Sequence, residues 1–391
     1  MEKIKIGDAC DILNGYAFKS ENYVDSGIRI IRISNVQKGY IEDNAPAFYS
    51  LDTAGMDKFM LEQGDLLMSL TGNVGRVAIL GKELLPAALN QRVACLRLKS
   101  DKISKRYLFH ILNSNFFEQQ CMMAAKGVAQ KNISTEWLKD YEIPLYAPAQ
   151  QAEIVTVLNA AQSVVASRKY ELQKLDELVK ARFVEMFGEP DKNTFAWNMT
   201  TVGALISSCD AGWSGNGTQR EKKDGEIAVL KVSAVTKGYF IPDECKVLDN
   251  QNNIKKYIFP QAGDLLFSRA NTREMVGATA VITQDYPEYI LPDKLWKIRF
   301  VEAANVWYMK YILSSETIRS VFSSVSTGTS GSMFNVSMEK FKSIMIPLPP
   351  LELQQQFATF VEQTDKSKAA AQKALDEAQL LFDSLMQQYF S

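Results

Sequence analysis

The stretch RISNVQKGY at residues 32–40 returns as KVSAVTKGY at residues 231–239, and GDLLMS at 64–69 returns as GDLLFS at 263–268. Each copy later ends in the same tripeptide, Ile-Pro-Leu. A repeat of this length exceeds the roughly 20 to 50 residues of a solenoid unit. The pattern therefore predicts an internal duplication that forms two similar domains, and two similar domains suggest a molecule that contacts two similar things.

Composition limits the class of protein. The chain has 391 residues, of which 46% are hydrophobic and 23% charged, which is typical of a globular protein with two or three domains. We find neither the apolar stretch of a signal peptide nor the roughly 18 apolar residues of a membrane span, so a cytoplasmic location without membrane contact is expected. The five cysteines lie far apart with no C-x-x-C pair, which argues against a disulfide framework or a zinc site.

The net charge of −1 does not indicate nucleic-acid binding, because dedicated binders usually carry a basic balance that neutralises phosphates. DNA binding is compatible with this charge in either of two cases. The basic side chains can be unevenly distributed over the surface, or a basic partner can supply the contacts to the DNA backbone while this chain reads bases.

Each copy begins with segments typical of strands and continues into helical patterns. Residues 28–33, 77–80 and 93–98 are rich in β-branched side chains and predict strands. Residues 107–117 and 306–322 predict short helices. Prolines then follow in both copies, at positions that suit the start of a helix.

The clearest periodicity follows these prolines, where apolar residues recur in steps of four and three. It predicts two helices of about 36 residues, each roughly 55 Å long. The expected division is a first domain at 1–148, a helix at 149–188, a second domain at 195–348 and a helix at 351–390. The residues expected to pack along these helices are Ile154, Leu158, Val165, Leu172, Leu175, Val179, Phe357, Val361, Leu375, Phe382 and Leu385.

Two equal helices in one chain favour antiparallel packing on each other, as a spacer between the domains. The alternatives are that each helix packs on its own domain or pairs between chains.

The order of motifs resembles a known family. GNVGRVA at 72–78 is followed by NQRVA at 90–94, GVAQKNIS at 127–134 and a long helix that ends in RFVEMFG at 182–188. This order resembles the specificity subunit of type I restriction-modification systems. The resemblance implies an α+β fold with two repeated α/β target-recognition domains separated by two long antiparallel coiled-coil helices. It also implies that each domain reads one half of a bipartite asymmetric DNA site, while the helices set the gap and dock methyltransferase subunits.

Catalytic signatures are missing from the sequence. The single histidine, His110, lies in an apolar helical pattern and is expected to pack rather than to catalyse. The chain has no G-x-x-x-x-G-K-[ST] phosphate loop, no G-x-G-x-x-G motif and no Asn-Pro-Pro-aromatic signature of adenine methyltransferases. The resemblance therefore implies a non-catalytic reader without a cofactor or metal of its own. S-adenosylmethionine, ATP and Mg²⁺ are expected on partner subunits.

The same resemblance implies double-stranded DNA and two methyltransferase subunits as partners, and leaves restriction or translocase subunits open.

Side chains suited to base and phosphate contacts gather in the loops. Arg and Lys read guanine in the major groove, Asn and Gln read adenine, and glycine turns allow close approach to phosphate. In copy one the expected DNA-binding residues are Thr71, Asn73, Arg76, Gln91, Arg92, Lys126, Gln130, Lys131 and Asn132. In copy two they are Arg269, Asn271, Thr272, Arg273, Lys294, Thr327 and Ser330.

Structural interpretations compete with these assignments. The turn at 72–75 suits a β-hairpin, and Asn132 and Asn335 each stand just before a serine, where capping of the following helix is an alternative to base contact. Two other functions also stay open: a duplicated scaffold that binds proteins rather than DNA, and an orphan specificity chain that competes for partners.

Overall fold

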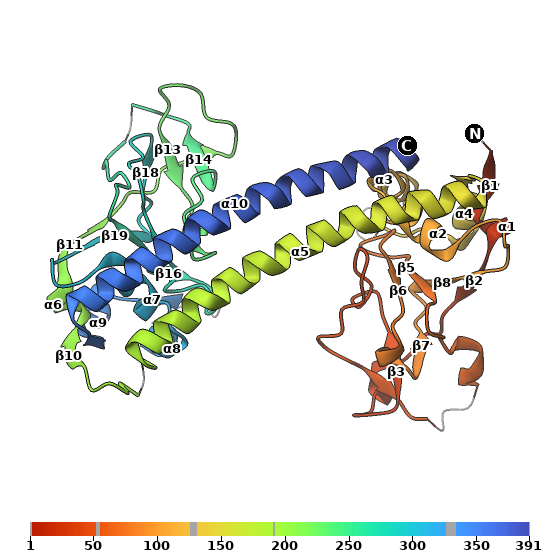
Figure 1. The fold of residues 1–391 in the computed structure, drawn as a ribbon, viewed down its shortest axis with the longest axis horizontal. Helices are drawn as coiled ribbons and strands as arrows, with labels where there is room; N and C mark the ends of the chain where they lie inside the picture. The colour runs from red at the N-terminus through yellow and green to blue at the C-terminus, as the bar shows by residue number, and fades with distance from the viewer. Residues whose placement is uncertain are drawn as a thin grey trace. The chain divides into compact units, whose positions relative to one another are not determined.

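The chain folds into two compact units in the computed structural model. Unit 1 comprises residues 1–170 and 372–391, and unit 2 comprises residues 171–371, so each unit holds the α+β part of one copy of the repeat (Figure 1). The residues described are 2–51, 55–125, 131–190, 192–252, 254–325 and 334–390. Four of the expected DNA-binding residues lie outside them, namely Lys126, Gln130, Thr327 and Ser330.

Unit 1 is built around an antiparallel four-stranded sheet of order β2-β8-β5-β6. Its strands are β2 (Cys10–Asn14), β8 (Val93–Leu98), β5 (Leu66–Ser69) and β6 (Val77–Ile79). A second sheet has the order β4-β3-β7, and a strand pair joins β1 to β9. These strands are β4 (Phe48–Tyr49), β3 (Ile28–Ile31), β7 (Ala87–Leu89), β1 (Lys3–Lys5) and β9 (Glu142–Pro144). Because every side chain of β5 is buried, this strand forms the centre of the domain.

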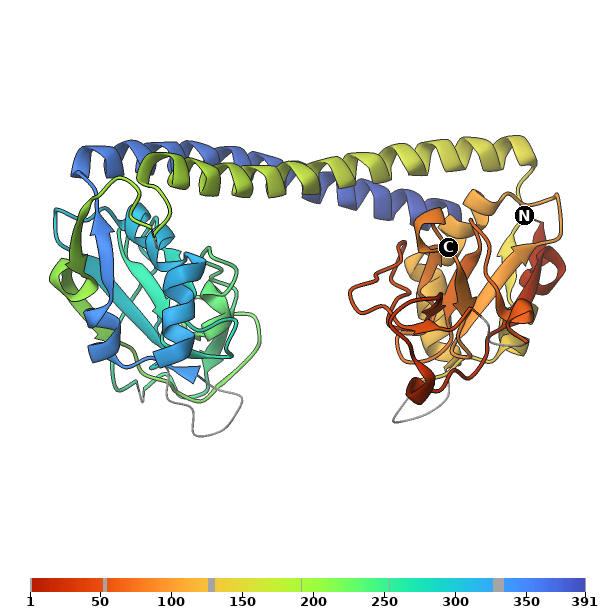
Figure 2. The same ribbon diagram turned by 90° about the horizontal axis from the view of Figure 1, so that it is seen from below.

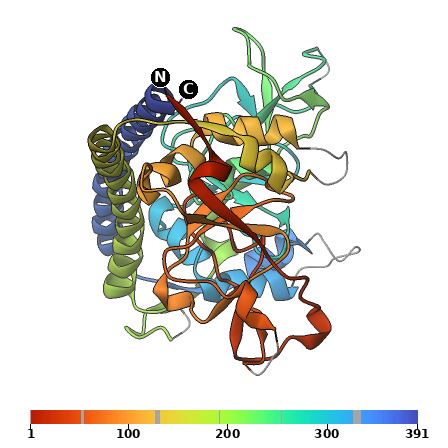
Figure 3. The ribbon, with the colours of Figure 1, turned by 90° about the vertical axis from the view of Figure 1, so that its right-hand side faces the viewer.

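The short α-helices of unit 1 are α1 (Ile6–Ala9), α2 (Lys105–Leu112), α3 (Asn115–Ala124) and α4 (Thr135–Asp140). Of these, α2, α3 and α4 begin at serine caps. The helical pattern expected over 107–117 forms parts of two helices, since Ser114 accepts the backbone N–H of Phe117 at 3.1 Å and starts a new helix. Figure 3 shows the molecule from the side of this unit, which contains both ends of the chain.

Unit 2 repeats this plan with the sheet order β11-β19-β15-β17. The strands are β11 (Ile206–Ala211), β19 (Leu295–Phe300), β15 (Leu265–Ser268) and β17 (Thr279–Val281). A second sheet has the order β12-β14-β13-β18, from β12 (Gly217–Thr218), β14 (Cys245–Leu248), β13 (Ala228–Leu230) and β18 (Tyr289–Ile290). Two strand pairs complete the unit: β10 (Asn198–Thr201) with β21 (Met345–Leu348), and β16 (Ala270–Asn271) with β20 (Phe334–Asn335).

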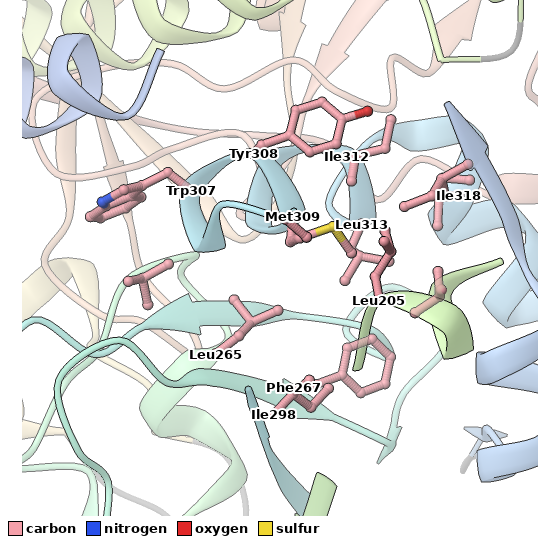
Figure 4. Packing of buried hydrophobic residues seen from close by; sticks show 14 of the residues in the cluster. Leu205, Leu265, Phe267, Ile298, Trp307, Tyr308, Met309, Ile312, Leu313 and Ile318 are labelled. Atoms are coloured by element: carbon pink, nitrogen blue, oxygen red, sulfur yellow. The ribbon is translucent and has the colours of Figure 1, made fainter. Parts of the chain in front are cut away.

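Four short helices cover the sheets of unit 2. They are α6 (Val202–Leu205), α7 (Val306–Leu313), α8 (Glu316–Val325) and α9 (Met338–Ser343). Here too the single helical pattern expected over 306–322 is interrupted, because the hydroxyl of Ser315 accepts the N–H of Ile318 at 3.4 Å and α8 begins. Tyr308 and Met309 of α7 belong to one buried cluster with Leu265 and Phe267 of β15 (Figure 4).

The two long helices are α5 (Pro148–Phe187) and α10 (Leu351–Phe390), each of 40 residues. In unit 1, Ile154 and Leu158 near the start of α5 share a buried cluster with Met386 and Phe390 at the end of α10. In unit 2, Val179 near the end of α5 shares one with Phe357. Within each unit the two helices therefore run antiparallel, and in each the pair packs onto the α+β part (Figure 2).

The expected packing residues differ in burial. Buried are Ile154, Leu158, Val165, Val179, Phe357 and Val361, and partly buried are Leu172, Leu175, Leu375, Phe382 and Leu385. Near the helix ends the buried side chains are ones that the heptad count did not include, namely Phe183, Phe187, Met386 and Phe390. These positions face the domain cores as well as the other helix, so the buried face widens beyond a two-helix seam.

A repeated glutamine ties each long helix to its domain. The Gln151 side chain accepts the N–H of Ser104 at 2.9 Å and donates to the carbonyls of Lys102 and Tyr146 at 2.7 and 2.8 Å. The Gln354 side chain makes the equivalent bonds, from the N–H of Asn305 at 2.8 Å and to the carbonyls of Ala303 and Pro349. Both side chains are buried, so these amides fix where α5 and α10 begin.

Over the part of the chain that the structure describes, none of the helices has both the length and the apolar character that crossing a bilayer requires.

Candidate nucleic-acid interface

Three loops of unit 1 meet where β5 ends. The backbone N–H of Leu70 donates to the carbonyl of Arg92 at 3.0 Å, and the N–H of Ile133 donates to the carbonyl of Leu70 at 2.9 Å. The N–H of Gly72 donates to the carbonyl of Lys131 at 3.0 Å. These bonds hold together the expected residues of three separate sequence segments, 71–76, 91–92 and 131–132.

A polar surface pocket of about 550 Å³ lies at this junction. Four of the expected residues line it, namely Thr71, Gln91, Arg92 and Asn132. The Thr71 hydroxyl donates to the side-chain oxygen of Asn132 at 3.1 Å, and the two residues also form a β-bridge. Gln91 and Arg92 are exposed, so their side chains are accessible to a ligand that approaches the pocket.

The glycine turn after Thr71 presents two further expected residues. Gly72 and Gly75 have φ values of 74° and 82°, a left-handed backbone that favours glycine. With its amide oxygen turned toward Arg76, Asn73 accepts from the guanidinium at 3.2 and 3.3 Å, and Arg76 also donates to Gln37. The hairpin requirement thus explains the glycines, and it also positions the Asn73 and Arg76 side chains beside the three loops.

Unit 2 has the same backbone junction with different side chains. The N–H of Arg269 donates to the carbonyl of Lys294 at 3.0 Å, and the N–H of Val336 donates to the carbonyl of Arg269 at 2.9 Å. The guanidinium of Arg269 donates to the carbonyl of Asp293 at 2.9 Å and to the side-chain oxygen of Asn335 at 3.4 Å. Arg269 is therefore held against the loops, half-buried, rather than projecting from them.

The remaining expected residues of unit 2 lie at the end of β16 (Asn271), on the loop after it (Thr272 and Arg273) and directly before β19 (Lys294). Asn271 uses its side-chain oxygen to accept the N–H of Thr272 at 2.8 Å. Thr272 and Arg273 are exposed, whereas Lys294 is half-buried. Arg273 is therefore the more accessible of the two arginines in this part of unit 2.

The capping alternative for the two asparagines is wrong. Helix α4 is capped by Ser134, which accepts from Trp137 at 3.1 Å, and α9 is capped by Ser337, which accepts from Lys340 at 3.3 Å. Asn132 and Asn335 instead bond to the side chains of the loop junction.

His110 packs inside unit 1, as the sequence predicts. It is buried on α2 with its Nε2 2.9 Å from the side-chain oxygen of Asn159, and burial lowers the pKa of its imidazole. Burial also raises the pKa of the Cys10 and Cys121 thiols to about 12, so neither is poised as a nucleophile. Within the described residues, no three His, Cys, Asp or Glu side chains are grouped as metal ligands.

The structure adds residues that sequence reasoning missed. In unit 1, Asn14, Ser134, Thr135 and Glu136 also line the pocket. Asn14 ends β2, which pairs with β8, so only knowledge of the sheet order would have placed it there. In unit 2, Asn335, for which the sequence left capping and base contact open, occupies the position equivalent to Asn132.

A family comparison now identifies the chain. The model of the type I restriction modification DNA specificity domain matches residues 1–177 and 214–379. The chain belongs to this family. The resemblance seen in the sequence is thereby confirmed, as is the expectation of two repeated specificity domains of mixed helix and strand.

Individual relatives of this specificity-domain chain agree with that assignment. The chain is 22% identical over 403 residues to the Type I restriction enzyme EcoKI specificity subunit of Escherichia coli (strain K12), which covers 96% of this chain and 84% of that one. It is 27% identical over 184 residues to the MjaVIII specificity subunit of Methanocaldococcus jannaschii. That match spans 46% of this chain and 43% of the relative, less than half of its length.

A solved structure has the same fold. The S subunit of the type I restriction-modification system from M. genitalium superimposes with a TM-score of 0.56 at 15% identity, over 100% of this chain and 96% of that one.

Proposed function

We propose that this chain is the DNA sequence-recognition subunit of a type I restriction-modification complex. Each unit reads one half of a bipartite asymmetric site. The observation that carries the proposal is the loop junction found at the end of β5 and again at the end of β15, with the same backbone hydrogen bonds and different side chains. A duplicated frame with divergent polar loops suits two readers of different base sequences.

Base reading follows from the side chains of each junction. In unit 1, Arg92 can pair with guanine, while Gln91 and Asn132 can pair with adenine. The missed residue Glu136 adds an acceptor that suits the amino group of cytosine. In unit 2 the exposed Arg273 is the main candidate for a guanine contact, and the half-buried Lys294 is the second. The two half-sites should therefore differ in sequence.

The proposed partners are two methyltransferase subunits, one for each half of the duplication. Support comes from exposed apolar side chains on the long helices, which a partner subunit would cover on binding. On α10 these are Leu380, 72% exposed, and Leu381. On α5 they are Val164, Tyr170, Leu178 and Val184.

The partners also carry the chemistry in this proposal. S-adenosylmethionine for adenine methylation belongs to the methyltransferase subunits, and ATP and Mg²⁺ belong to restriction or translocase subunits where the system has them. Because basic partner surfaces can supply phosphate contacts, the near-neutral charge of this chain is compatible with the role. The complex would act in the cytoplasm, where chromosomal DNA is accessible.

A direct test is methylome sequencing. The chain would be produced with its methyltransferase subunits in a host that lacks adenine methylation, and single-molecule sequencing would record modified adenines. We expect one bipartite motif with a fixed gap, absent when this chain alone is omitted. The same adenine methylation with and without this chain would overturn the proposal.

A further inference from the structure

The tripeptide Lys-Gly-Tyr at residues 38–40 and 237–239 is identical in the two copies, whereas the loops of the two junctions differ. Tyr40 and Tyr239 end these tripeptides, and both side chains are 58% exposed. Neither ring belongs to a hydrophobic cluster among the described residues. The core therefore gives no reason for the duplication to retain a tyrosine at this position.

The backbone around the two tyrosines shares two features, a left-handed glycine and one equivalent hydrogen bond. It differs in a third, because the N–H of Gly238 bonds to the carbonyl of Val235, whereas that of Gly39 bonds to Val77. Gly39 and Gly238 have φ values of 91° and 81°, and an added Cβ at either would meet no atom within 4 Å. Glycine is thus retained for its left-handed backbone rather than for space. The N–H of Glu42 donates to the carbonyl of Asn35 at 2.8 Å, and the equivalent bond in unit 2 joins Ile241 to Ala234 at 3.0 Å.

The turn of unit 1 lies beside the candidate interface. Gln37, immediately before the tripeptide, accepts a hydrogen bond from Arg76 of the glycine turn. The N–H of Gly39 donates to the carbonyl of Val77 at 2.9 Å, directly after that turn. A DNA duplex that contacts Arg76 would therefore also approach the Lys-Gly-Tyr turn.

We propose that the Lys-Gly-Tyr turns are a matched pair of sequence-independent DNA contacts, in which the hydroxyls of Tyr40 and Tyr239 donate to phosphate oxygens. The inference rests on the proposed function. The side chains that differ between the two junctions read the bases, which differ between the two half-sites. The residues that both copies keep contact the part of the DNA that both half-sites have in common. The shared feature is the sugar-phosphate backbone, to which tyrosine and lysine side chains commonly bond.

The lysines of the two turns differ in their surroundings. Lys38 pairs with Glu118 at 2.6 Å and bonds to Asn115 at 2.7 Å. At the position equivalent to Glu118, α8 carries Arg319, so the turn of unit 2 lacks this acidic neighbour. The tyrosine is therefore the common contact.

The experiment uses the complete complex with its methyltransferase subunits. Binding of cognate and unrelated duplexes would be measured by fluorescence anisotropy for Tyr40→Ala, Tyr239→Ala and the matching Phe variants. Loss of a hydrogen bond to a charged group predicts about tenfold weaker binding for each substitution. The loss should be equal on cognate and unrelated DNA, and the methylated motif should not change. Tyr257→Ala is the matched control, since Tyr257 is 51% exposed in unit 2 and lies outside the matched stretches.

Photocrosslinking identifies the bound partner. Benzoylphenylalanine placed at position 40 or 239 should crosslink to DNA. Crosslinks to a methyltransferase subunit instead, or unchanged affinity in all four variants, would overturn the proposal. A change of methylated motif confined to one base would also overturn it, because the contact would then read sequence. If the unmodified complex neither binds nor methylates a bipartite site, the proposed function fails, irrespective of the turns.

Discussion

At the loop junction after β5 of unit 1 stands the apolar residue Leu70, and the neighbouring Thr71 bonds to Asn132. After β15 of unit 2, Arg269 occupies the place of Leu70, and its guanidinium bonds to Asn335. The backbone bonds around the two positions agree to within a tenth of an ångström. The comparison teaches that the frame and the reading surface are separable, because a different side chain reaches the repeated asparagine in each unit.

The frame of both units depends on a buried aspartate in the repeated Gly-Asp-Leu-Leu motif. Asp65 pairs with Arg97 at 2.8 Å, and Asp264 pairs with Arg299 at 2.7 Å and Lys297 at 3.1 Å. Asp264→Ala leaves these cations without their buried partner, so we expect unit 2 to lose about 3 kcal/mol of stability. Urea unfolding followed by the fluorescence of Trp296 and Trp307 would measure the loss.

The control for this comparison is Asp11→Ala. Asp11 is 63% exposed and lies 3.4 Å from Lys99, a surface pair that contributes little. Asp65→Ala should destabilise unit 1 by a similar amount, measured by hydrogen exchange in its strands. If Asp264→Ala were as harmless as Asp11→Ala, the two frames would not share this support.

The repeated glutamines give the next largest effect. Gln354→Met keeps the length of the side chain but leaves the N–H of Asn305 and two carbonyls unpaired. We expect a loss of about 2 kcal/mol, since each buried unpaired group is costly. Gln355→Met, at the neighbouring exposed position, is the matched control. Equal unfolding midpoints for the two variants would contradict the role assigned to Gln354.

The smallest expected change in stability comes from a position where the two units carry different residues. Phe109 of α2 is buried, and its counterpart in α7 is Lys310, whose pKa burial lowers from 10.5 to about 8. Between pH 8 and 10.5 the unfolded chain holds this proton and the folded chain does not. Stability should therefore rise with pH across that window.

Lys310→Met should remove this contribution. Because Lys310 is only partly buried and the substitution also loses its contacts with the Trp307 and Tyr311 rings, we expect a net gain in the stability of unit 2 of about 1 kcal/mol at pH 7. The measurement is the difference between the two proteins in urea unfolding at pH 7, 8, 9 and 10, which cancels the other titrating groups. A parallel pH dependence in both would show that Lys310 is not the source.

Much of the fold was predictable because repetition and periodicity are local properties of the sequence. The repeated Gly-Asp-Leu-Leu motif forms β5 and β15, and the proline-led periodicity forms α5 and α10. The burial of Phe183 and Met386 could not be read in the same way. A heptad count assumes one partner helix, whereas these residues also pack on the domain cores.

The loops that form the candidate site were predictable from the sequence, but the contacts between distant segments were not. Gln91, Arg92 and Asn132 are polar residues beside strand ends, which places them at the surface. Asn14 joins them through the pairing of β2 with β8, a long-range contact without a local signal. The tethering of Arg269 to Asp293 and Asn335 likewise depends on segments 24 and 66 residues away.

The central claim is that each unit reads its own half-site. Its most direct test is the methylome of two variants of the complete complex, one with Gln91→Ala and Arg92→Ala together and one with Arg273→Ala. Each variant should alter base preference in one half of the motif, about tenfold or more at a position, with the gap and the other half unchanged. Changes in both halves from either variant, or in neither half from both, would contradict the account.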